Sequence, residues 1–122
     1  MAMHQTNGKL PIEQANEILK KNIDKITSSR KWKEMMGWQN EAKFSRAYRK
    51  LCGIRPSGRV VELKVAVAIE LLKNNRELSC FDIAQHIGKA NDKALNKFLK
   101  YHTGKSPSWY RNNVQSTKKI GS

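Results

Sequence analysis

The sequence lacks a long hydrophobic run and has only two cysteines, and each shortage excludes a class of protein. No stretch approaches the ~20 consecutive apolar residues that a membrane-spanning helix needs, and residues 1–9 have no apolar signal core. Cys52 and Cys80 lie far apart, with no Cys-x-x-Cys or His-x-x-x-His spacing. We therefore expect a cytoplasmic chain without a metal site, in which both cysteines act as small hydrophobic residues.

Acidic residues are also scarce, and this shortage indicates the partner. The chain has 24 Lys and Arg against 10 Asp and Glu, for a formal net charge of +14. For a helical domain of this sign the leading partner is nucleic acid, bound through phosphate neutralisation and counterion release. An anionic membrane surface is the main competitor. We expect double-stranded DNA as the partner and no membrane.

Helical spacing runs through almost the whole chain, and no strand alternation competes with it. Apolar residues at three- and four-residue steps predict a first helix over about residues 12–22. Residues 1–10 and 113–122 carry little apolar content, and we expect them to be flexible tails. A proline stands where each of three helices would begin, at Pro11, Pro56 and Pro107.

Two segments of equal length superpose without gaps, which indicates an internal duplication. Residues 37–53 align with residues 88–104, at an offset of 51 residues. The offset also pairs Ser28 with Ser79, Trp32 with Ile83, Met36 with Ile87 and Pro56 with Pro107. Each copy predicts a short helix ending near a glycine, a turn, an asparagine cap, and a longer helix ended by a second glycine. This order is typical of a helix-turn-helix unit.

Residues 57–74 connect the two copies and are apolar at most positions. The residues left for water are Arg59, Glu62, Lys64 and Glu70. A helix that is apolar on most sides must be covered on most sides, so we expect a long linker helix with one copy packed at each end. The predicted organisation is a helix-turn-helix subdomain over 11–56, a linker helix over 57–74 and a second subdomain over 75–112.

Helix geometry separates an inner and an outer face on each longer helix. The arcs expected to face inward are Phe44, Ala47, Tyr48 and Leu51, and Leu95, Phe98, Leu99 and His102. The outward arcs, which we predict to read DNA bases, are Ala42, Ser45, Arg46 and Arg49, and Lys93, Asn96, Lys97 and Lys100. Such side chains suit a major groove: Arg46 a guanine edge, Asn96 an adenine edge and Ala42 a thymine methyl group.

Residues around these helices are candidates for phosphate contacts. Hydroxyl groups, cations and free backbone N–H groups at a helix start bind phosphate oxygens. The candidates are Ser28, Ser29, Arg30, Lys31, Arg55, Ser79, Lys89, Lys105 and Arg111. Each of them alone is a weak signal, because basic surface residues are commonly only solvated.

Several features occur together: the repeat, the Phe44-Ser45-Arg46 run, Gly53, Gly104, and residues 105–111 with the sequence KSPSWYR. Over about residues 12–112, they resemble the AraC/XylS family of bacterial transcription regulators. The resemblance implies an all-α fold of about seven helices, with two homeodomain-like helix-turn-helix subdomains joined by a long helix. It also implies regulation of transcription by reading two neighbouring major-groove segments.

Two positions depart from the family pattern. Lys33 stands where a small residue is usual, whereas Ala84 fits, and Lys89 stands where an aromatic residue is usual, whereas Trp38 fits. A long charged side chain at Lys33 is expected to affect how the first helix of the first helix-turn-helix unit packs. Lys89 becomes a further candidate for a phosphate contact.

Other functions stay open at this point. The chain could be a protein-interaction module that contacts RNA polymerase or another regulator, or a non-specific nucleic-acid coat. Family members usually carry a separate sensing or dimerisation domain, and nothing in this chain resembles one. Trp32 and Trp38 could stack on unpaired bases, but Trp32 aligns with Ile83 and is expected in the core. No Ser-His-Asp set, paired carboxylates or phosphate loop is evident, so we expect no enzymatic activity and no cofactor.

Overall fold

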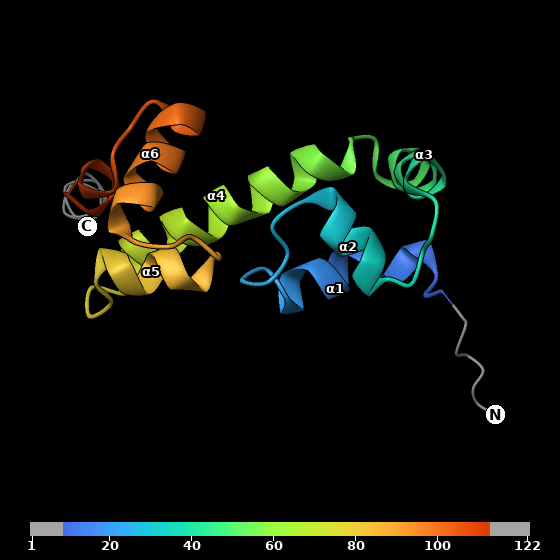
Figure 1. The fold of residues 1–122 in the computed structure, drawn as a ribbon. Helices are drawn as coiled ribbons and strands as arrows, with labels where there is room; N and C mark the ends of the chain where they lie inside the picture. The colour runs from blue at the N-terminus through green and yellow to red at the C-terminus, as the bar shows by residue number, and fades with distance from the viewer. Residues whose placement is uncertain (1–8, 113–122) are drawn as a thin grey trace. The chain divides into compact units, whose positions relative to one another are not determined.

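The computed structural model describes residues 9–112, and the regular elements in this range are helices (Figure 1). In chain order they are the 3-10 helix η1 (Ile12–Gln14), α1 (Ala15–Lys21), α2 (Ser29–Met35), α3 (Glu41–Cys52), α4 (Pro56–Asn74), α5 (Cys80–His86) and α6 (Asp92–Thr103). Residues 107–112 are also helical. No strand occurs among the described residues, so the prediction of an all-α fold is confirmed.

The chain forms two compact units, and their boundary along the sequence falls within α4. The first unit contains residues up to Leu63, and the second contains residues from Lys64 onward. The long helix expected over 57–74 is therefore present, and it supplies side chains to both units. Residues 1–8 and 113–122, which we expected to be tails, lie outside the described residues.

The first unit packs α1, α2 and α3 around Trp32. The Trp32 side chain is fully buried, and its indole Nε1 donates a hydrogen bond to the carbonyl of Ala15 at 3.0 Å. The indole ring meets Phe44 and Tyr48 edge-on, at centroid distances of 5.5 and 4.9 Å. Edge-to-face pairs add to the gain from buried area. Trp32 is thus a core residue, as expected.

The first unit begins earlier in the chain than the sequence predicts. Leu10, which we expected in a flexible tail, donates its backbone N–H to the carbonyl of Met36 at 2.8 Å. Its own carbonyl accepts the indole N–H of Trp38 at 2.9 Å, and its side chain packs against the core. The tail assignment is wrong at Leu10 because contacts with residues far along the chain leave no trace in local composition.

The second unit has an aliphatic core built by α4, α5 and α6. Ala68 and Leu72 of α4 are fully buried. They pack with Ile83, Ala84, Ile87, Leu95 and Leu99. Ala15 and Leu19 of α1 form a buried pair with the same spacing in the first unit. The C-terminal half of α4 therefore does in the second unit what α1 does in the first.

The duplication in the sequence extends to the helix ends. In the repeated helices α2, α3, α5 and α6, the N-cap side chain accepts a backbone N–H from the first turn. The four caps are Ser28, Asn40, Ser79 and Asn91. At the C-terminal ends of α3 and α6, Gly53 and Gly104 adopt the left-handed backbone conformation, with φ of 84° and 82°. Glycine takes this conformation without a Cβ clash. Equivalent residues therefore begin and end equivalent helices.

Lys64 is buried, although the sequence predicts that it faces water. Its exposed fraction is 3%, and its Nζ donates a hydrogen bond to the carbonyl of Ile87, the C-cap residue of α5. Met36 is the equivalent residue in the first unit, and its carbonyl receives the N–H of Leu10. In each unit, a donor from outside the helix-turn-helix motif thus satisfies the carbonyl that ends the first helix.

Two further residues, which we expected to face the cores, are exposed to solvent. Leu51 is 50% exposed at the end of α3, and His102 is exposed near the end of α6. They hold equivalent positions of the repeat. The buried residues of these helices end one turn earlier, at Tyr48 and Leu99. Helix geometry alone extends the apolar arc beyond the point where the core stops.

Lys33, which stands where the family usually has a small residue, is compatible with helix α2. α2 forms over its full length, and the half-buried Lys33 places its Nζ 3.5 Å from the carbonyl of Gln39. The equivalent carbonyl in the second unit belongs to Ala90, and it accepts the side-chain amide of Gln85 at 3.0 Å. The same turn carbonyl is therefore satisfied in both units, by side chains one repeat position apart.

Candidate nucleic-acid interface

α3 presents its predicted base-reading residues on the side opposite the first core. Phe44 and Tyr48 are fully buried, so the opposite side of the helix is held outward. Of the four predicted residues, three are exposed and one is half-buried: Ala42, Arg46 and Arg49, and Ser45. The two arginines line a shallow hollow of about 490 Å³ with Lys50 and Gly53.

α6 presents an equivalent face in the second unit. Leu95 and Leu99 are fully buried, and the four predicted base-reading residues are exposed: Lys93, Asn96, Lys97 and Lys100. These four side chains line a shallow hollow of about 510 Å³, together with Asn91 and Ala94. No carboxylate is among these lining residues. The structure thus gathers the predicted base-reading residues of each unit on one helix face.

A third hollow joins α3 to two predicted phosphate contacts. It measures about 250 Å³, and its lining includes Ala42, Ser45, Ser29 and Arg55. Glu41, in the first turn of α3, also lines it. An acidic group at this end of a helix is favoured by the helix dipole. Because Glu41 is the acidic residue of α3, the rest of the outward face carries no negative charge.

The predicted phosphate contacts at the helix starts have defined local partners. Ser28 Oγ accepts the backbone N–H of Lys31 at 3.3 Å. Ser79 and Asp82 form a reciprocal capping box, in which Ser79 Oγ donates to the Asp82 carboxylate at 2.9 Å. Hydrogen bonds from Ser79 lower the pKa of Asp82 below its usual value. These two hydroxyl groups therefore organise helix ends, whereas the cationic side chains of Arg30 and Lys31 are exposed.

Two lysines of the second unit lie over aromatic rings. Lys89 Nζ is 4.3 Å from the centre of the Phe98 ring, and Lys105 Nζ is 4.9 Å from the centre of the Trp109 ring. Both distances suit a cation–π interaction. The rings therefore restrict the directions in which these two ammonium groups extend.

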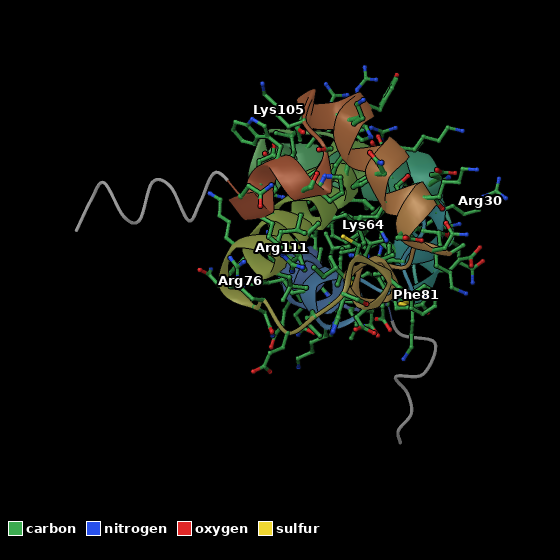
Figure 2. The ribbon with its side chains drawn as sticks, turned by 90° about the vertical axis from the view of Figure 1, so that its left-hand side faces the viewer. Arg30, Lys64, Arg76, Phe81, Lys105 and Arg111 are labelled. Carbon is green, nitrogen blue, oxygen red and sulfur yellow. The ribbon has the colours of Figure 1, made fainter. Side chains whose placement is uncertain are left out.

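Arg111 has a structural role that the sequence did not indicate. It donates from Nε to the carbonyl of Leu72 at 3.3 Å and from a terminal nitrogen to the carbonyl of Asn75 at 3.2 Å. Figure 2 shows Arg111 near Arg76 and away from Lys105. These bonds tie residues 107–112 to the C-terminal end of α4. The phosphate contact expected of Arg111 stays a prediction.

A polar network that sequence analysis missed holds α3 in place. Arg59 of α4 donates from Nε to the hydroxyl of Tyr48 at 3.0 Å, and the Tyr48 hydroxyl donates to the side-chain oxygen of Asn16 in α1. Arg59 also pairs with Glu62. Burial raises the pKa of Tyr48, and the hydrogen bond from Arg59 opposes that rise. Arg59, which we expected to face only water, thus helps to anchor α3.

Tyr101 is a further outward residue of α6 that sequence analysis missed. It is 84% exposed, and it lies one helical turn after Lys97. The equivalent residue of the repeat is Lys50, which lines the hollow beside Arg46. A comparison of outward positions between the two copies is the signal that could have revealed it.

Residues 9–112 contain neither a metal-binding cluster nor a membrane-spanning helix. No group of His, Cys, Asp and Glu side chains in this range is arranged to hold a metal ion. No helix in this range has the length and apolar character of a membrane span. Cys52 and Cys80 are both free and half-buried.

Comparisons with known proteins identify the fold. No protein-family profile and no curated protein matches the sequence. One similar solved structure is the DNA-binding domain of AdpA, a global transcriptional factor, in complex with a target DNA. It has a TM-score of 0.75 and 19% sequence identity, and the similarity covers 90% of this chain and 97% of that one. The C-terminal domain of AraT, a response regulator from Geobacillus stearothermophilus, is similar with a TM-score of 0.71 and 22% identity, over 84% of each chain.

A third similar structure carries the family description itself. It is a transcriptional regulator with an AraC-type DNA-binding domain from Chromobacterium violaceum, with a TM-score of 0.68 and 19% identity, over 93% of this chain and 96% of that one. The arrangement of helices is shared over most of each of the three solved chains. The chain therefore has the fold of the AraC-type DNA-binding domains, as the resemblance in sequence predicts.

Proposed function

We propose that the chain binds double-stranded DNA in a sequence-specific manner as a transcription regulator, and that α3 and α6 each read a major-groove segment. The observation that carries the proposal is the pair of equivalent outward faces. Both are free of acidic side chains beyond the first turn, and both are held by buried residues on the opposite side of the helix. AdpA, which has the same fold, was solved with a target DNA, and this supports DNA as the partner.

Base recognition is assigned to the outward faces. The Arg46 guanidinium donates two parallel hydrogen bonds to a guanine edge, and the Asn96 amide pairs in the same way with an adenine edge. Ala42 gives an apolar contact to a thymine methyl group. Ser45, Arg49, Lys93, Lys97 and Lys100 complete the two faces. Major-groove edges distinguish all four base pairs, so these groups are sufficient for sequence preference.

Phosphate contacts supply the remaining affinity. Three exposed cations belong to the first unit. Arg30 and Lys31 lie at the start of α2, and Arg55 lines the same hollow as Ala42. Lys89 and Lys105 have the same role near α6, with their ammonium groups held over aromatic rings. A net charge of +14 attracts the DNA backbone from a distance. These contacts position the protein on DNA and carry no sequence information.

The test is selection of bound duplexes from a random pool, followed by affinity measurements on a selected and a scrambled duplex. We expect the selected duplex to bind more tightly. We also expect binding to fall on the order of a thousandfold between about 50 and 200 mM salt if about six phosphates are contacted. Equal affinity for both duplexes would indicate a non-specific coat. A flat salt response would reject DNA binding and favour a protein-interaction module.

A further inference from the structure

Tyr101 exposes nearly all of an aromatic side chain on α6, one helical turn after Lys97, a predicted base-reading residue. Its exposed fraction of 84% exceeds the 50% of Leu51 and Phe81 and the 40% of Trp109, the other large exposed hydrophobic residues described. A single exposed aromatic residue needs no special explanation. Tyr101, however, is in contact with a neighbouring ring, that of His102.

A row of four side chains runs along one flank of α6 and ends at Tyr101. Lys89 Nζ lies over the Phe98 ring at 4.3 Å. The Phe98 ring meets His102 edge-on at 4.8 Å, and His102 in turn meets Tyr101 at 4.9 Å with an interplanar angle of 89°. We call these four residues the aromatic row. A side chain that is already held in one orientation loses less conformational entropy when it binds a partner.

The repeat indicates which partner Tyr101 fits. Its equivalent in α3 is Lys50, an exposed cation that lines a hollow with Arg46 and Arg49. Lysine and tyrosine differ in charge, but both donate hydrogen bonds to phosphate oxygens. The nearest outward residues of α6, Lys97 and Lys100, are cationic and exposed. A polyanion is therefore the partner that the charge around Tyr101 favours.

We propose that Tyr101 is a DNA-backbone contact of the second unit, in which its hydroxyl donates a hydrogen bond to a phosphate oxygen beside the groove segment read by α6. The edge-on contact with His102 favours one orientation of the phenol ring. The inference rests on the proposed function and deepens it. In this proposal the charged side chain of Lys50 makes the equivalent phosphate contact in α3, and the neutral side chain of Tyr101 makes it in α6.

This difference in charge gives a specific test. A neutral hydroxyl displaces no condensed counterion, whereas a lysine that neutralises a phosphate contributes about one unit to the salt slope of binding. We expect Tyr101→Phe to weaken binding on the order of tenfold, on selected and scrambled duplexes alike, with an unchanged salt slope. Lys50→Ala is expected to lower the slope by about one unit. Tyr101→Lys, in contrast to Tyr101→Phe, is expected to keep binding at low salt and to steepen the slope by about one unit.

Matched variants separate the contact from effects on folding. Because Tyr101 is almost fully exposed, Tyr101→Phe should keep the thermal midpoint, which circular dichroism measures. Lys20→Ala, in α1, removes an exposed lysine from a helix that carries none of the candidate residues, and should leave the affinity nearly unchanged. If the unmodified chain binds DNA and Tyr101→Phe binds equally well, this inference is overturned and the proposed function stands. A loss confined to the selected duplex also overturns it, because a phosphate contact carries no sequence preference. If the unmodified chain binds no DNA, both proposals fail.

Discussion

The buried ammonium group of Lys64 donates a hydrogen bond to the carbonyl of Ile87, the C-cap residue of α5. Ile87 is followed by Gly88 and the turn that leads into α6. A side chain of the long helix α4 therefore holds the start of the turn that leads into α6. Removing one partner from a buried, charged hydrogen bond leaves the other partner unsatisfied, which is more costly than the net gain from forming the bond.

We expect Lys64→Met to lower the free energy of unfolding by about 1 to 3 kcal/mol, because the carbonyl of Ile87 loses its side-chain donor. Chemical denaturation measures this change. Lys73→Met is the matched control, since Lys73 is an exposed lysine of the same helix, and should change stability by no more than about 0.5 kcal/mol. Equal stabilities of the two variants would contradict the role assigned to Lys64.

Phe44→Ala and Leu95→Ala should each lower the free energy of unfolding by about 2 to 5 kcal/mol, because each leaves a cavity in the core of its unit. Leu51→Ala is the comparison in the same helix as Phe44. Leu51 is already half exposed, so its truncation should cost much less. Thermal midpoints unchanged by the first two substitutions would show that the inner faces of α3 and α6 are assigned incorrectly.

Arg46→Ala and Lys31→Ala should affect DNA binding in different ways. Loss of the Arg46 contact should cost about 1 to 3 kcal/mol on the preferred duplex and less on random duplexes, because a base contact is lost. Loss of Lys31 should weaken all duplexes alike and lower the salt slope by about one unit. Fluorescence anisotropy over a salt series measures both effects. If Arg46→Ala weakens every duplex equally, its role as a base contact is wrong.

Asn96→Ala extends the same measurement to the second unit. We expect it to relax sequence preference at base pairs different from those affected by Arg46→Ala, because the two residues lie on different helices, each of which is proposed to read its own groove segment. Binding to a set of single-base variants of the selected duplex locates the affected positions. Overlap of the two sets would count against the proposal that α3 and α6 read separate segments.

Asp82 should titrate below its usual range, and Ser79→Ala should raise its pKa part of the way back toward about 3.8. The cause is the loss of the hydrogen bond that Ser79 Oγ donates to the ionised carboxylate. The hydrogen bond from the backbone N–H of residue 79 remains. Because the folded-state pKa is lowered, the capping box contributes stability above the unfolded-state pKa, and this contribution is lost as the pH falls through the folded-state pKa. An NMR titration of the Asp82 carboxyl group measures the shift. An identical pKa in the two proteins would exclude the hydrogen bond from the Ser79 hydroxyl as a cause.

The sequence by itself determined the helical class, the duplication and the outward faces of α3 and α6. These features depend on residues within a few positions of one another. Asn40 and Asn91 begin the two helices through bonds to their first turns, and Gly53 and Gly104 end them through a backbone conformation that favours glycine. Phe44 and Leu95 are buried at equivalent positions, so helical periodicity was sufficient to place the opposite side outward.

Only the tertiary structure decided which polar and terminal residues belong to the cores. Leu10 joins the first unit through Met36 and Trp38, and Lys64 enters the second unit to reach Ile87. These bonds connect residues more than one helix apart, and neither periodicity nor local composition contains information about such pairs. The same reason explains Leu51 and His102, because where an apolar arc stops being covered depends on the length of the neighbouring helices. A buried lysine is stable only where a folded neighbour supplies an acceptor, and that neighbour exists only in the folded chain.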